Sequence, residues 1–220
     1  MFGQNPKLAP EKGDGNILKV HSVFATIQGE GPYTGHPAVF IRLSGCNLAC
    51  TFCDTEFDSY IETDVRALVE NVKELSGGTM KLVVITGGEP FRQKIGILCN
   101  ALLDNGFKVQ IESNGTLYQE IPDSVEIVCS PKNTGSGYHA IREDVLKHTI
   151  ALKFLISASQ KDYSDIPVFI ENQEDIAIYV QPMDEYDDYK NSVNQQLAMK
   201  VANEKNAIFS LQLHKILNIA

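Results

Sequence analysis

Three of the five cysteines lie close together in the sequence, at Cys46, Cys50 and Cys53. This C-x3-C-x2-C spacing allows three thiolates to converge on one metal centre. Structural zinc usually has four protein ligands, so a zinc site would need a distant fourth ligand, either Cys99, Cys129 or a histidine. An iron–sulfur cube usually has four cysteine ligands. With only three, one iron stays open to a substrate or cofactor, which is the arrangement that a catalytic cluster requires.

The remaining two cysteines have a different context. Cys99 lies in a helical pattern of apolar residues and Cys129 in a strand pattern. Since a free cysteine packs as a small hydrophobic residue, we expect both to be core thiols. The odd number and the clustering of three argue against a disulfide framework, and clustered thiols in a reducing compartment indicate a metal.

Polar motifs follow several apolar, strand-like segments of the chain. They are Thr86-Gly87-Gly88-Glu89-Pro90, Glu112-Ser113-Asn114-Gly115-Thr116, Ser130-Pro131-Lys132 and Gln181-Pro182-Met183-Asp184. Each has an ordinary interpretation as a turn, a solvated lysine or a core methionine. If they follow successive strands of one parallel sheet, however, their side chains would surround a single pocket.

The hydrophobic pattern predicts the sheet that would bring these motifs together. We expect strands over residues 19–26, 38–43, 82–85, 108–112, 126–129, 152–156, 168–170, 176–181 and 207–211. Helices are expected after an N-cap at Thr63, over 95–103 and over 189–202. The alternation indicates βαβ units and a mainly parallel sheet, whose functional loops lie at the carboxyl ends of the strands. Residues 1–220 are predicted to form one α/β domain, with residues 1–16 as a flexible arm.

Composition excludes some classes of partner. The net charge is −9 and the pI is about 5.0, which argues against a broad surface for nucleic acid or anionic membranes. No apolar run approaches the roughly 20 residues of a membrane helix. The polar N-terminal residues do not resemble a secretory signal, so we expect a cytoplasmic protein.

The cysteine motif, with Phe52 before its third cysteine and the Gly-Gly-Glu-Pro turn at Gly88, resembles the radical S-adenosylmethionine (SAM) superfamily. That resemblance implies a [4Fe–4S] cluster on Cys46, Cys50 and Cys53 whose open iron binds SAM. An electron from the cluster then cleaves SAM to a 5′-deoxyadenosyl radical, which abstracts hydrogen from the substrate. The implied fold is a partial, modified TIM-type (β/α) barrel with a reduced set of helices.

Further segments narrow the resemblance to the 7-carboxy-7-deazaguanine synthases. They are Ile27-Gln28-Gly29-Glu30-Gly31, residues 37–42, Gly45-Cys46-Asn47-Leu48, Cys53-Asp54-Thr55 and Leu211-Gln212-Leu213-His214-Lys215. The similarity runs from Val20 to the C-terminus. It implies a lyase that converts 6-carboxy-5,6,7,8-tetrahydropterin to 7-carboxy-7-deazaguanine and ammonia, in the biosynthesis of queuosine and other 7-deazapurines. It also implies Mg²⁺ as a cofactor, flavodoxin or ferredoxin as the reductant, and a homodimer.

The same resemblance assigns roles to particular residues. The expected SAM contacts are Gly88, Glu112, Ser130, Pro131, Lys132, Gln181, Pro182, Met183 and Asp184. The expected substrate contacts are Ile27, Gln28, Gly29, Arg42, Thr86 and Ala220. Thr55 is the expected ligand of Mg²⁺, which prefers oxygen.

The residue types fit these roles, although each has a simpler alternative. Arg42 can bind the substrate carboxylate through two hydrogen bonds, but it could instead pair with a surface acid. Thr55 could cap a turn, Ala220 could be a frayed terminus, and His214 is as well explained by packing as by catalysis. Two other functions stay open at this point: another radical SAM enzyme, such as a glycyl-radical-enzyme activase, and a zinc-binding interaction module.

Overall fold

The computed structural model describes residues 5–167 and 176–219. Within them, one nine-stranded sheet has the order β3-β1-β2-β4-β5-β6-β7-β8-β9. The strands are β1 (Ile17–Ile27), β2 (Pro37–Leu43), β3 (Ile61–Asp64), β4 (Leu82–Gly87), β5 (Lys108–Ser113), β6 (Glu126–Cys129), β7 (Thr149–Ile156), β8 (Ala177–Pro182) and β9 (Ile208–Phe209). The helices are α1 (Val65–Ser76), α2 (Gly96–Asp104), α3 (Glu143–Leu146), α4 (Asp188–Lys205) and α5 (Leu213–Leu217), with 3-10 turns η1 (Gly31–Tyr33), η2 (Pro90–Arg92) and η3 (Lys161–Tyr163).

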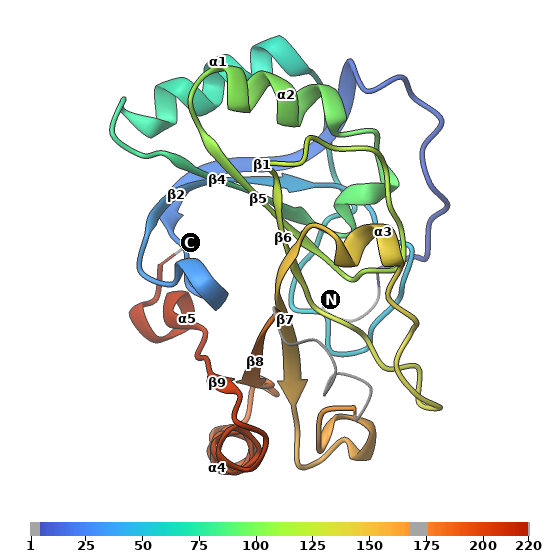
Figure 1. Ribbon diagram of the computed structural model, residues 1–220, viewed down its shortest axis with the longest axis vertical. Helices are drawn as coiled ribbons and strands as arrows, with labels where there is room; N and C mark the ends of the chain where they lie inside the picture. The colour runs from blue at the N-terminus through green and yellow to red at the C-terminus, as the bar shows by residue number, and fades with distance from the viewer. Residues whose placement is uncertain (1–4, 168–175, 220) are drawn as a thin grey trace.

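The sheet is a partial barrel, as expected from the sequence. From β2 to β9, omitting β3, the strands follow chain order and every neighbouring pair is parallel. The sheet curves from α1 and α2 at one end of the molecule to α4 at the other, and it does not close on itself (Figure 1). Because all these parallel strands run the same way, their carboxyl ends form one edge.

Burial explains why the central strands could be recognised in the sequence. Residues 82–86 of β4 are all buried, as are Val109 and Ile111 of β5. A parallel strand that is covered on both faces is expected to be continuously apolar rather than alternating. Helix α1 contributes Leu68, Val69 and Val72 to the same core from one face.

The expected N-cap of α1, Thr63, was wrong. The N-cap is Asp64, whose carboxylate accepts hydrogen bonds from the amides of Arg66 and Ala67. Thr63 lies in the short edge strand β3, and its hydroxyl donates to the Ile61 carbonyl. The helix ends at Gly77, which has the left-handed φ of 55° that glycine adopts readily.

Other differences concern the ends of the chain. Strand β1 is antiparallel to β2 and β3, and the expected strand over 207–211 is reduced to Ile208–Phe209. The expected strand over 168–170 lies outside the described residues. Residues 5–16, expected as part of a flexible arm, instead make hydrogen bonds to the cysteine loop and to η2. In the part of the chain that the structure describes, no helix has both the length and the apolar character needed to cross a bilayer.

Candidate active site

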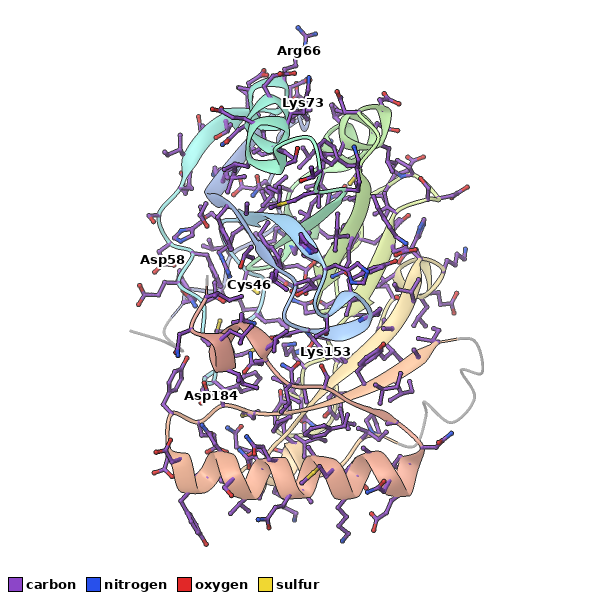
Figure 2. The ribbon with its side chains drawn as sticks, turned by 90° about the vertical axis from the view of Figure 1, so that its left-hand side faces the viewer. Cys46, Asp58, Arg66, Lys73, Lys153 and Asp184 are labelled. Atoms are coloured by element: carbon purple, nitrogen blue, oxygen red, sulfur yellow. The ribbon has the colours of Figure 1, made fainter. Side chains whose placement is uncertain are left out.

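A cavity of about 440 Å³ lies at the carboxyl edge of the parallel strands, enclosed by the loops that follow them. Figure 2 shows Cys46, Lys153 and Asp184 around the middle of the molecule, between α1 and α4. Most residues that the sequence assigned to a site line this cavity: Ile27, Gln28, Gly29, Arg42, Cys46, Cys50, Cys53, Thr55, Thr86, Gly88, Glu112, Ser130, Lys132, Gln181, Met183 and Asp184. Pro131 and Pro182 are not among its lining residues, and Ala220 lies outside the described residues.

The three clustered cysteines form one wall of the cavity as free, half-buried thiols. Their loop is closed at its base by the Ser44 hydroxyl, which donates to the Phe57 carbonyl at 2.6 Å. Burial raises the pKa of Cys46 to about 11 and also raises that of Cys50. The thiols of Cys46 and Cys50 are therefore protonated at neutral pH, and binding of a metal centre would release those protons.

The arrangement of the thiols discriminates between the two metal sites considered from the sequence. Among residues 5–167 and 176–219, no three His, Cys, Asp or Glu side chains are placed to hold a single metal ion. Cys99 and Cys129, the possible fourth zinc ligands, are fully buried in the core. In an iron–sulfur cube each thiolate binds a different iron, so its cysteines need not converge on one point. Cys46, Cys50 and Cys53 therefore fit the cysteine set of an iron–sulfur cluster, and no fourth zinc ligand lies with them among the described residues.

The turn after β4 packs directly on the backbone of the cysteine loop. The amides of Gly88 and Glu89 donate to the carbonyls of Leu43 and Gly45, at 3.1 and 3.0 Å. A Cβ added at Gly88 would stand 2.0 Å from the Gly45 oxygen, so only glycine allows this approach. The second glycine of the motif is thus required by packing, whatever ligand its backbone contacts.

Glu89 joins the ends of β4 and β5. Its carboxylate accepts hydrogen bonds from the Ser113 hydroxyl at 2.8 Å and the Asn114 amide at 2.7 Å. Burial outweighs these donors and raises the pKa of Glu89 to about 7. The side chain of Asn114 in turn donates to Asn47 in the cysteine loop at 3.0 Å. The end of β5 therefore supports the loop that carries the thiols.

Arg42 and Thr55 meet beside the cysteines. Arg42 Nη1 donates to Thr55 Oγ1 at 3.1 Å, and the guanidinium lies 5.7 Å from the centre of the Phe24 ring. Arg42 therefore faces the cavity, and it forms no ion pair with an acid of residues 5–167 or 176–219. The Thr55 hydroxyl also donates to Asp54 at 3.4 Å, which places two oxygen-bearing side chains of the kind that magnesium binds at this point.

A second polar group lines the cavity at the ends of β1, β4 and β5. Glu112 accepts hydrogen bonds from Gln28 Nε2 at 3.1 Å and from Thr86 Oγ1 at 3.2 Å. The carboxylate thus fixes the amide of Gln28 and the hydroxyl of Thr86 beside the cavity. This network brings together two predicted substrate contacts and one predicted SAM contact.

Sequence reasoning missed Lys153, a buried cation that lines the same cavity. Its ammonium forms an ion pair with Glu30, and both side chains are almost fully buried. Burial favours the neutral forms, but the opposite charge outweighs it: the pKa of Glu30 falls to about 2 and that of Lys153 rises. The sequence did contain a signal for this ion pair, namely a lysine inside the apolar run of β7. A lysine is almost never fully buried without a partner, so its position indicates a buried acidic partner.

The C-terminal segment closes the cavity from the open side of the sheet. The amide of Leu213 donates to the Gly29 carbonyl at 3.0 Å, and Gln212 donates to Glu30 at 2.8 Å. Lys215 lies between Asp54 and Asp184 and is 2.9 Å from each carboxylate. His214 packs so closely on Gly29 that an added Cβ would be 2.4 Å from its ring nitrogen, which explains that glycine.

Comparison with known proteins gives consistent matches. The Radical SAM superfamily model matches residues 40–148. The 7-carboxy-7-deazaguanine synthase of Rickettsia prowazekii (strain Madrid E) is 53% identical, over 100% of this chain and 96% of its own. The enzyme of the same name from Rhodospirillum rubrum is 36% identical over the whole of both chains. The crystal structure of QueE from Escherichia coli superimposes with a TM-score of 0.76 and 25% identity, covering 93% of this chain and 100% of that one.

Proposed function

The chain belongs to the 7-carboxy-7-deazaguanine synthases, a family of radical SAM enzymes, and from this premise we propose its substrate and the roles of its residues. It converts 6-carboxy-5,6,7,8-tetrahydropterin to 7-carboxy-7-deazaguanine with release of ammonia, for queuosine or another 7-deazapurine. The observation that carries this proposal is the single cavity that joins three free thiols to Arg42 and Thr55. The cysteines alone would serve any radical SAM enzyme.

The cysteine wall and the strand ends hold the cofactors. Cys46, Cys50 and Cys53 bind the [4Fe–4S] cluster, which together with SAM supplies a carbon-centred radical able to abstract hydrogen. SAM contacts come from the backbone of Gly88 and from the polar strand ends, namely Glu112, Ser130, Lys132, Gln181, Met183 and Asp184. Pro131 and Pro182 fix the backbone between these residues, because proline locks φ.

Lys132 is half-buried at the end of β6. Its ammonium donates to the carbonyl and the hydroxyl of Ser130, at 2.6 and 2.7 Å. Burial lowers the pKa of Lys132, so an anionic group beside it would stabilise the charged form. The SAM carboxylate is such a group.

Substrate binding uses side chains beside the cysteines and at the ends of β1 and β4. Arg42 holds the pterin carboxylate, since a guanidinium fork matches a carboxylate with two hydrogen bonds. Gln28 and Thr86, both fixed by Glu112, bind the polar edge of the ring, while Ile27 and Gly29 contact its faces. Thr55 binds Mg²⁺ next to Arg42, so the cation and the guanidinium share the negative charge of the substrate.

The C-terminal segment covers part of the cavity, which favours a small substrate. Lys215 clamps α5 onto the cysteine loop and the end of β8, and Gln212 is hydrogen-bonded to the Glu30 carboxylate. A glycyl-radical-enzyme activase would instead need an open face for its protein substrate. From the family resemblance we also propose flavodoxin or ferredoxin as the electron donor, a homodimer, and a single domain over residues 1–220. The same resemblance proposes a substrate contact from Ala220.

The first test is substitution of Arg42. Arg42→Ala should weaken binding of carboxytetrahydropterin about 10- to 100-fold, the effect of losing hydrogen bonds to a charged group. Iron and sulfide content should be unchanged, because Arg42 bonds to Thr55 and to no cysteine. Arg66→Ala is the matched control, since Arg66 projects from α1 far from the cavity (Figure 2). Loss of iron from Arg42→Ala, or unchanged substrate binding, would contradict the assigned role.

A further inference from the structure

Residues 5–11 run along the cysteine loop and are hydrogen-bonded to it. Lys7 pairs with Cys46 as an isolated parallel bridge, and the amide of Leu8 donates to the Cys46 carbonyl at 2.8 Å. The side chains of residues 6–10 are exposed, whereas that of Asn5 is only 7% exposed. Asn5 is therefore the one side chain of residues 5–10 that is turned into the protein.

The amide of Asn5 reaches two residues of the proposed metal site. Its Nδ2 donates to the Thr55 carbonyl at 2.8 Å and to Cys53 Sγ at 3.5 Å. The side-chain amide has two N–H groups, which allows one for each acceptor. In the free thiol form, Cys53 also donates to the Thr55 carbonyl, at 3.5 Å. A cysteine that binds a metal has lost that proton, and the Asn5 amide is then the donor to both the oxygen and the sulfur.

This contact has a direct consequence for a bound cluster. A thiolate that accepts an N–H group is stabilised, and hydrogen bonds to the sulfurs are among the features that set the reduction potential of an iron–sulfur centre. Reduction adds negative charge to the cluster and its thiolates, so a donor stabilises the reduced form more than the oxidised form. A donor at Cys53 therefore raises the potential and makes the cluster easier to reduce.

The anchor of the segment is independent of Asn5. Arg92, which is buried, donates to the Ala9 carbonyl at 3.1 Å and to the Glu11 carboxylate at 2.9 Å. The amide of Glu11 donates back to the Arg92 carbonyl at 2.7 Å. Substitution of Asn5 should therefore remove one amide from the metal site without releasing the segment.

We propose that Asn5 is a positioning residue for the cluster: it orients Cys53 and Thr55 and raises the reduction potential of the centre. The inference rests on the proposed binding of the cluster by Cys46, Cys50 and Cys53. It assigns a role to a residue outside the cysteine motif and more than forty residues from it in sequence. The effect acts through Cys53, so it is visible in the cluster itself and does not require turnover.

The test compares the full-length parent with Asn5→Leu, Asn5→Asp and Asn16→Leu, each reconstituted anaerobically with iron and sulfide. Midpoint potentials are measured by spectroscopic redox titration without substrate, and iron loss to a chelator is followed over time. Leucine keeps the approximate volume of Asn5 without a donor, and aspartate keeps its shape but offers only acceptors. Asn16 is the matched control, since it is an exposed asparagine shortly after this segment and bonds to Asp14.

At the midpoint potential of the parent, the ratio of reduced to oxidised cluster in Asn5→Leu should be about fivefold lower than in the parent. This is the effect expected from the loss of one hydrogen bond. For a one-electron couple this is a potential about 40 mV more negative. Asn5→Asp should shift further in the same direction, both variants should lose iron faster, and Asn16→Leu should match the parent. Apo-protein melting identifies a variant that fails to fold, in which case the other variant decides.

Parent-like potentials and iron loss in Asn5→Leu and Asn5→Asp would overturn the inference while leaving the proposed function intact. A parent that takes up no cluster would overturn both the proposed function and the inference.

Discussion

Replacement of Lys153 by methionine should strongly destabilise the protein, because it leaves Glu30 buried without its counter-ion. The side chains of Lys153 and Glu30 are 7% and 13% exposed, so water replaces little of the lost interaction. Removal of one partner of a buried ion pair typically costs about 3–5 kcal/mol. The lowering of the Glu30 pKa from 4.5 to about 2 corresponds to about 3 kcal/mol at 1.36 kcal/mol per pKa unit. The typical cost of breaking a buried ion pair and the pKa shift of Glu30 thus both predict a loss of about 3 kcal/mol in the free energy of unfolding.

The assay is equilibrium urea unfolding of the apo-protein. With a slope of about 2–3 kcal/mol per molar urea, a loss of 3 kcal/mol lowers the midpoint by about 1 to 1.5 M. Lys153→Met combined with Glu30→Gln should recover most of the loss, because neutral partners of similar size leave no buried charge. Lys73→Met is the control: its pair with Glu70 is exposed, so it should change stability by less than about 0.5 kcal/mol.

The pH dependence gives an independent check on the same pair. The folded pKa of Glu30 lies below its value in the unfolded chain, so its contribution to stability is complete above pH 4.5 and disappears as the pH falls toward 2. The gap in unfolding free energy between the parent and Lys153→Met should therefore be widest at neutral pH and narrow below pH 4.5. A Lys153→Met effect as small as that of Lys73→Met, or no recovery in the double variant, would refute the reasoning.

Two further predictions concern the loops around the cavity. Lys215→Met should free α5 from the two aspartates that it bridges, so amide hydrogen exchange in α5 should accelerate while global stability changes by only about 1 kcal/mol, because these side chains are partly exposed. The exposed control Lys200→Met should leave amide exchange in α5 unchanged. Unchanged exchange in Lys215→Met as well would contradict the proposed role of Lys215 in holding α5. Gly88→Ala should cost about 3 kcal/mol in urea unfolding, because the new Cβ would be 2.0 Å from the Gly45 oxygen. Gly13→Ala, with no atom within 4 Å of the new Cβ, should be nearly neutral, and equal midpoints for the two variants would contradict the packing argument.

The parts of the fold that could be predicted are those with a strong local signal. The run 82–85 is continuously apolar and buried, and the turn that follows it begins with glycines that tolerate close packing. Once the strands were recognised as parallel, the motifs at their ends had to share one edge, which is why so many predicted residues line the same cavity. The direction of β1 could not be read this way, because apolar patterning does not encode strand direction.

The parts that could not be predicted depend on partners distant in sequence. Residues 5–16 are polar and rich in glycine and proline, which predicts a flexible arm, yet Arg92 and the cysteine loop hold them. The pair of Lys153 and Glu30 joins residues 123 positions apart. Strand β3 lies at the sheet edge with no buried residue, so its sequence lacks an apolar pattern altogether.

The most direct test of the proposed function measures both products of the reaction in one sample. The anaerobically reconstituted protein is incubated with 6-carboxy-5,6,7,8-tetrahydropterin, SAM, Mg²⁺ and a reductant, and 7-carboxy-7-deazaguanine and ammonia are quantified over time. The two products should appear in equal amounts, and Cys46→Ala should form neither. A fully reconstituted and reduced protein that consumes SAM without forming carboxydeazaguanine, or a Cys46→Ala variant as active as the parent, would contradict the account.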